Sequence, residues 1–196
     1  TFSSKELNKN NVKSGSFPSV VFNGSTSEIF VANDDKFNFN SKDDFTISFW
    51  VNVNAQGRFF DKNYLISKST TQTFIPSITT TKTGTPQKIN VSGALQPQEL
   101  DAGPRHPFEI YVEDSGADNE PHLFFTRAND NATRLISASF TTGSTLQHVT
   151  CRYSNSEMKI FINGVASGTS GSDNLGITQN NANLYIGNKG GKSNFL

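Results

Sequence analysis

A pair of glutamates is the first candidate for a catalytic site. Glu109 and Glu113 lie four residues apart on an expected strand, with Tyr111 between them on the same face. Glycoside hydrolysis needs two carboxyl groups, one to protonate the leaving oxygen and one to attack or to activate water. No strand carries an alternating run of acids that would supply such a pair. The two glutamates are therefore expected on a solvated strand face, and the sequence predicts a protein that is not an enzyme.

The histidines and the single cysteine give no positive sign of a nucleophilic or zinc site. His106, His122 and His148 are scattered, and no Gly-x-Ser-x-Gly motif is present. Cys151 is three residues from His148, which places the two side chains on opposite faces of an expected strand. We therefore expect Cys151 to be a small buried apolar side chain.

Three aromatic side chains are candidates for binding a sugar ring. Trp50, Tyr111 and Phe30 fall on strand faces opposite to the apolar alternation. An exposed ring can act as a platform for a sugar, and the Asn-rich loops could add hydrogen bonds. The alternative is that another element covers these rings, as often happens to large aromatics on a second strand face.

Short strands must position these side chains. From Phe45 to Val53, apolar and polar residues alternate with the period of two that places one face in a core. Asn163-Gly164 between two apolar runs indicates a hairpin. About ten such strands without a convincing helix predict an all-β fold of two antiparallel sheets, a jelly-roll sandwich. The expected core residues are Phe45, Ile47, Phe49, Val149, Cys151, Ile160 and Ile162.

Two segments fall outside the strand pattern. Residues 1–18 are polar and aperiodic, so they are expected to form an arm or linker before one domain at 19–196. Residues 69–107 are rich in Thr, Pro, Gly and Gln and are interpreted as a long inserted loop. This loop is either an interface with another chain or a mobile surface loop. The interface candidates are Phe74, Ile75 and Leu95.

Composition excludes several classes of protein. The 196 residues include 17 basic and 17 acidic side chains, which leaves no electrostatic footprint for nucleic acid. No stretch approaches the ~18 consecutive apolar residues of a transmembrane helix, so membrane insertion is not expected. A lone cysteine cannot form an internal disulfide.

Four motifs in order resemble the laminin-G-like, concanavalin A-like jelly rolls. Residues 22–25 read Phe-Asn-Gly-Ser, similar to the opening turn of that family, and residues 45–51 end in its Trp-Val pair. Residues 148–165 contain a His-Val strand followed by a strand ending in Asn-Gly, and 183–187 is similar to the Ile-Gly strand that follows. Gln147 departs from the pattern, because the family often has Trp there.

The resemblance covers about 19–68 and 107–196. It implies a concanavalin A-like sandwich in which one sheet is usually concave, with 69–107 inserted between two family strands. It also implies a closing strand where the sequence stops, at Phe195-Leu196. We expect that strand to come from further chain or from a neighbouring subunit, since an open sheet edge invites pairing.

The resemblance also implies a calcium site, because family members often hold an ion at the sandwich rim. Aspartate side chains and loop carbonyls supply the oxygen ligands that calcium prefers. Ordinary solvated turns are the alternative, since the 114–120 loop lacks the full EF-hand pattern. The candidate ligands are Asp34, Asp35, Asp114 and Asp118.

The expected function is recognition or adhesion without catalysis, outside a cell or on a virion, through a glycan or a protein surface. A structural role in a virion, as capsid decoration, tail or fibre, or in another surface assembly, is the main alternative. A carbohydrate-active enzyme is the weaker alternative, because the family fold hosts glycoside hydrolases. Other subunits of a larger assembly are expected partners, and the assembly state of the purified chain would separate recognition from structure.

Overall fold

The computed structural model describes residues 2–5, 19–23, 27–40, 42–53, 62–69, 105–114, 120–129 and 132–189. The interface candidates Phe74, Ile75 and Leu95 lie outside these ranges, as does Asp118. The prediction of a missing closing strand also rests on residues outside them. No helix in the described ranges is long and apolar enough to cross a membrane.

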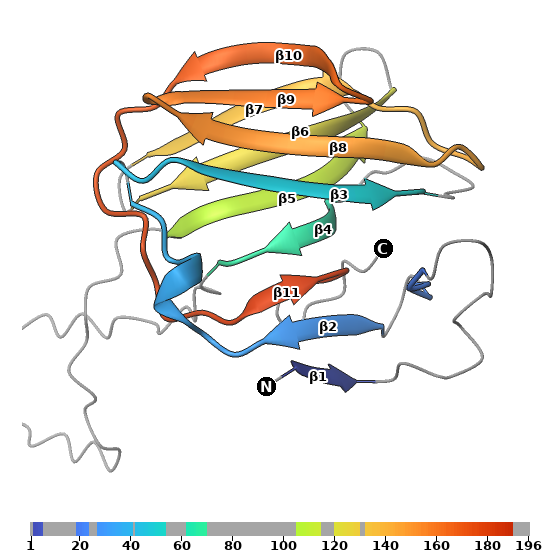
Figure 1. Cartoon of the computed structure of the whole chain (residues 1–196), viewed down its shortest axis with the longest axis horizontal. Helices are drawn as coiled ribbons and strands as arrows, with labels where there is room; N and C mark the ends of the chain where they lie inside the picture. Colours follow the sequence, from blue (N-terminus) through green and yellow to red (C-terminus); the bar gives the residue numbers. More distant parts are fainter. Residues whose placement is uncertain are drawn as a thin grey trace, which may run out of the picture.

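Antiparallel strands in two sheets make up the described part of the chain, which confirms the predicted all-β jelly-roll sandwich. Seven strands form one sheet in the order β1-β2-β11-β4-β5-β6-β7, and four form the other in the order β10-β9-β8-β3. Figure 1 shows the four-stranded sheet lying over β5, β6 and β7. The elements are β1 (Phe2–Lys5), β2 (Glu28–Val31), the 3-10 turn η2 (Asp35–Phe37), β3 (Phe45–Val51), β4 (Asn63–Ser67), β5 (His106–Asp114), β6 (Pro121–Ala128), β7 (Thr133–Ser139), β8 (Gln147–Ser154), β9 (Glu157–Ile162), β10 (Val165–Ser172) and β11 (Leu184–Ile186).

The core lies between the sheets and is built from alternate residues of each strand. Phe45 of β3 stacks on Phe39 with ring centroids 4.4 Å apart and meets Phe125 of β6 edge-on at 6.2 Å. Four of the seven predicted core residues are buried, namely Phe45, Val149, Cys151 and Ile160. The other three, Ile47, Phe49 and Ile162, are partly buried and pack against that core.

The two sheets meet along one edge, where β10 runs beside β7. Gly168 of β10 has φ +88°, and a Cβ atom there would overlap the backbone carbonyl of Ser137 on β7. Only glycine accepts both that backbone conformation and that approach. Gly168 therefore sets how closely the sandwich closes on this side.

Both segments predicted to lie outside the strands contribute to the sheet. Phe2–Lys5, in the predicted arm, pairs with β2, and Phe2 faces Val31 in the register. The predicted insertion at 69–107 extends too far at its end, because β5 begins at His106. The apolar run at 108–112 marked only the middle of that strand, since His106 and Pro107 carry no alternating apolar pattern.

A buried ion pair ties the segment after β10 to the sheet. The Arg127 guanidinium on β6 lies 2.5 Å from the Asp173 carboxylate, and both side chains are fully buried. The guanidinium also donates to the carbonyls of Pro107 and Asn40, and lies 3.9 Å from the centre of the Tyr153 ring. Because a buried charge is costly without partners, this network fixes the course of the chain towards β11.

Candidate functional site

The outer face of the four-stranded sheet carries three rows of side chains that the pairing register aligns across the strands. One row is aromatic, the next combines hydroxyls with an aromatic ring, and the third is mainly basic. Alternation along each strand sends these side chains away from the core. The rows are Trp50 and His148; Ser48, Thr150, Phe161 and Ala166; and Thr46, Arg152 and Lys159.

Trp50 dominates the first row, with 65% of its surface exposed. Its ring centroid lies 4.9 Å from that of His148 on the neighbouring strand, with the planes tilted by 42°. An exposed indole combines a large apolar surface with one N–H donor. The pair therefore offers a flat apolar surface bordered by polar groups.

The hairpin after β9 holds His148 in place. The Asn163 N–H donates to the His148 carbonyl at 2.8 Å, and the Asn163 side-chain oxygen accepts from the His148 N–H at 2.9 Å. Asn163 and Gly164 adopt φ of 52° and 80°, which the Asn-Gly sequence tolerates. The turn predicted from the sequence therefore also positions a residue of this face.

The second row, next to Trp50 and His148, carries the hydroxyl groups of Ser48 and Thr150. Ser48 Oγ lies 2.8 Å from His148 Nε2 and 3.1 Å from Thr150 Oγ1. Among the described residues, no carboxylate contacts His148 as the third member of a Ser–His–Asp triad would. Cys151 lies on the inner face, where burial raises the pKa of its thiol. What the row offers a ligand is hydrogen bonding.

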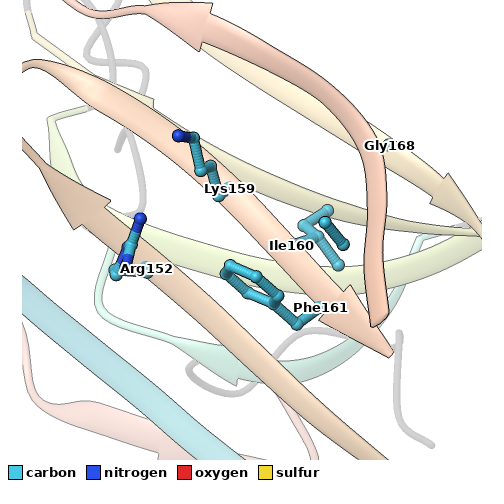
Figure 2. A pocket seen from close by; sticks show the side chains of 6 residues that line it. Arg152, Lys159, Ile160, Phe161 and Gly168 are labelled. Carbon is cyan, nitrogen blue, oxygen red and sulfur yellow. The ribbon is translucent and has the colours of Figure 1, made fainter. Parts of the chain in front are cut away.

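A shallow hollow of about 320 Å³ opens at the far end of the face, between β8, β9 and β10. Figure 2 shows Phe161 beside it, with Arg152 on one side. The Arg152 guanidinium carbon lies 5.6 Å from the centre of the Phe161 ring. Lys159 Nζ is 2.9 Å from Glu157, and that hydrogen bond holds the pKa of the Glu157 carboxyl below its usual value.

Comparison with known proteins shows the family to which the chain belongs. A family model described as the concanavalin A-like lectin/glucanases superfamily matches residues 23–196. The chain belongs to this superfamily. The match confirms the resemblance seen in the sequence motifs, and no curated protein is significantly similar to the chain.

Two solved structures are similar to the chain at low sequence identity. Domain 4 of AbnA, a GH43 extracellular arabinanase from Geobacillus stearothermophilus, in complex with arabinotriose, is similar at 16% identity and a TM-score of 0.50. That match covers 100% of this chain and 70% of the other. Domains LG4-5 of the mouse laminin alpha1 chain match at 10% identity and a TM-score of 0.47, over 88% of this chain. The chain spans about a third of that laminin structure, 35% of its length.

The other two aromatic candidates of this superfamily domain are less accessible than Trp50. Tyr111 is only 4% exposed on the outer face of the seven-stranded sheet, which agrees with the alternative that other residues cover its ring. It stacks on Phe124 with centroids 5.0 Å apart and lies 5.5 Å from Tyr64. Phe30 is half-buried on β2, 6.4 Å from Tyr185.

Glu109 is buried, which corrects the expectation of a solvated strand face at this residue. It is 3% exposed, and its carboxylate lies 2.7 Å from Lys189 Nζ, 3.2 Å from Ser67 Oγ and 3.8 Å from His106 Nε2. Burial alone would raise the pKa of Glu109, but His106 and Lys189 together hold it below its usual value. Lys189 follows the Ile-Gly strand, and nothing in the sequence links it to β5.

The calcium candidates lie at opposite ends of the seven-stranded sheet. The register aligns Ile29 with Ile186, Ile186 with Ile66, and Ile66 with Ile110. Asp34 and Asp35 follow the end of β2, and Asp114 is the last residue of β5. Since β2 and β5 run in opposite directions, Asp34 and Asp35 lie at the end of the sheet where β5 begins, away from Asp114. One ion shared by the two groups is therefore excluded.

At the Asp34 end, a lysine side chain already occupies a cluster of oxygen atoms. Lys68 Nζ lies 2.6 Å from Asn33 Oδ1, 2.7 Å from the Ala182 carbonyl and 3.4 Å from Asn180 Oδ1. The Asp34 carboxylate accepts from the Lys36 N–H at 2.9 Å and caps η2. No group of three acidic, His or Cys side chains suited to a metal occurs among the described residues, and calcium binding at either end stays a prediction.

Proposed function

We propose that this domain is a non-catalytic recognition module that binds a glycan through the outer face of its four-stranded sheet. The observation that carries the proposal is the 65% exposure of Trp50, the single tryptophan of the chain. Burying a large apolar side chain contributes about 1.5–3 kcal/mol of free energy, and most of that gain is absent while the side chain stays in water. A sugar ring stacked on the indole would recover part of that energy.

The polar surroundings of Trp50 suit a sugar better than they suit a wholly apolar partner. Ser48 lies on the same strand as Trp50, and His148 and Thr150 lie on the neighbouring strand β8. All three offer hydrogen-bond donors or acceptors near the indole. Pockets for small ligands combine an apolar surface with a few fixed polar groups. The arabinotriose in the AbnA domain structure supports a sugar ligand, as fold-level analogy only. Action outside a cell or on a virion belongs to the same proposal.

The burial of Glu109, one of the two glutamates considered as a carboxylate pair, disfavours the enzyme alternative. Glu109 is enclosed by Lys189, Ser67 and His106, and cannot reach a substrate without breaking those contacts. On the four-stranded sheet, Glu157 pairs with Lys159 at the far end from Trp50. Recognition without hydrolysis is accordingly the activity proposed.

A glycan array probed with wild-type protein and Trp50→Ala tests the proposal. Loss of the stacked ring should weaken glycan binding about tenfold or more. Leu135→Ala is the matched control, because Leu135 is 56% exposed on β7 of the other sheet. Wild-type protein that retains no glycan, or Trp50→Ala protein that binds as wild type does, would overturn the proposal.

A further inference from the structure

The outer face of the four-stranded sheet changes character along its strands, and this bears on the class of glycan. Trp50 and His148 stand at one end, and Arg152 is four residues along β8 from His148. Four residues of strand span roughly 14 Å, and neighbouring strands are about 4.8 Å apart. A short oligosaccharide that stacks on Trp50 and extends along the strands is therefore long enough to reach Arg152.

Arg152 makes no direct ion pair in the described part of this face, although its charge helps to lower the pKa of the Glu157 carboxyl. Lys159 is paired with Glu157 at 2.9 Å. The other acid at this end, Asp44, accepts from Ser154 Oγ at 2.9 Å and from the Asn155 N–H at 3.1 Å, where it caps the β8–β9 turn. Within the described ranges, no acid lies at ion-pair distance from Arg152.

The surroundings of Arg152 prepare it to bind an anion. The Phe161 ring lies 5.6 Å from the guanidinium carbon, so the planar group rests against an apolar surface. The adjoining hollow is lined by Arg152, Lys159 and Phe161 among others, and Figure 2 shows Arg152 and Lys159 on neighbouring strands there. A guanidinium presents paired donors that match the two oxygens of a carboxylate, and it matches a sulfate similarly.

We propose that the glycan is anionic, with a carboxylate or sulfate bound by Arg152 while another sugar ring stacks on Trp50. This rests on the proposed function and adds the class of ligand to it. Trp50 supplies most of the contact area, and Arg152 supplies the selection for charge. A neutral sugar of the same shape would leave the guanidinium solvated and would bind more weakly.

The test is an array that prints each glycan in matched forms: neutral, uronic acid, uronic acid methyl ester and sulfated. Wild-type protein should prefer an anionic form over its neutral partner about tenfold or more, since charge-assisted hydrogen bonds exceed neutral ones. Arg152→Gln should abolish that preference and leave the neutral form bound as before. The uronic acid and sulfated forms show whether a carboxylate or a sulfate is bound. The methyl ester differs from the uronic acid mainly by the loss of the negative charge.

Arg134→Gln is the matched control, because it removes an exposed arginine from β7 of the other sheet. It should bind as wild type does. Equal binding of neutral and anionic forms, or an anionic preference that survives in Arg152→Gln, would overturn the inference while binding through Trp50 stood. Loss of all binding in wild-type protein would instead refute the proposed function, and this inference with it.

Discussion

His106 and Glu109 are buried near each other on β5, and burial and nearby charges shift the pKa of each. The free energy of unfolding should therefore depend on pH. Burial is the main reason that the pKa of His106 falls from 6.5 to about 4, although the nearby Glu109 opposes the shift. Three cations close to the ring also lower that pKa. They are Lys189, Lys62 and Arg127.

Acidification should therefore destabilise the fold. Between pH 6.5 and about 4 the unfolded chain holds a proton on His106 that the folded chain does not. The free energy of unfolding should fall over this window, by up to about 3 kcal/mol from this residue. Below pH 4.5, protonation of Glu109 in the unfolded chain extends the loss, since its folded pKa is lower.

Urea denaturation at a series of pH values between 7 and 5 measures this slope. His106→Gln should flatten it. His122→Gln is the control, because His122 lies on the adjacent strand β6 and is only partly buried, and it should leave the slope in place. Identical slopes for wild type and His106→Gln would show that His106 is not held neutral by the fold.

At the scale of elements, the contact between β10 and β7 depends on Gly168. Gly168→Ala adds a methyl group that meets the Ser137 carbonyl, in a backbone conformation that alanine resists. The expected loss of stability is on the order of 3 kcal/mol. Gly164→Ala is the matched control, since φ there is +80° but nothing lies within 4 Å, and it should cost about 1 kcal/mol. Equal melting temperatures for the two variants would contradict this account of the closed edge.

The Arg127–Asp173 pair connects β6 to the segment after β10, and its variants should not be additive. Arg127→Met leaves the Asp173 carboxylate buried without its cation, which should cost about 3–5 kcal/mol of stability. Adding Asp173→Asn removes that stranded charge and keeps an acceptor for the Leu175 N–H. The double variant should therefore be more stable than Arg127→Met alone in urea denaturation. A double variant that is less stable would mean that the pair is not the source of the loss.

At the scale of the whole molecule, glycan recognition requires that no second subunit cover the outer face of the four-stranded sheet. Light scattering of the purified chain should give a mass near 21.4 kDa. Trp50→Ala should leave the mass unchanged. A multimer that Trp50→Ala separates into monomers would assign this face to subunit contacts and favour the structural role.

The sandwich could be predicted because alternation and turn residues are local signals. The period of two from Phe45 to Val53 fixed which side of β3 faces the core, and Asn163-Gly164 marked the hairpin between β9 and β10. Neither signal reports what lies over the opposite face of a strand. For that reason the burial of Tyr111 stayed one of two alternatives and that of Glu109 was missed. It depends on Tyr64 and Phe124 from neighbouring strands and on Lys189 from the segment after β11.

The candidate site was predictable at one residue. Alternation along β3 placed Trp50 opposite the core, where it is exposed. Its partners His148 and Ser48, and the charged Arg152, follow from the register between strands, which the sequence does not state. The same alternation applied to β8 and β9 would have placed His148, Arg152 and Phe161 outside the core, but not beside one another. Likewise, only the register shows that Asp34 and Asp114 lie at opposite ends of the sheet.

The fluorescence of Trp50 tests glycan binding at this face most directly, because no other tryptophan contributes to the emission. The protein is titrated with glycans from the array while emission and acrylamide quenching are followed. The account predicts that a glycan shifts the emission to shorter wavelength and protects Trp50 from acrylamide, as a stacked sugar would exclude water from an indole that is 65% exposed. Saturable glycan binding, measured by calorimetry, that leaves both the emission and the quenching of Trp50 unchanged would contradict it.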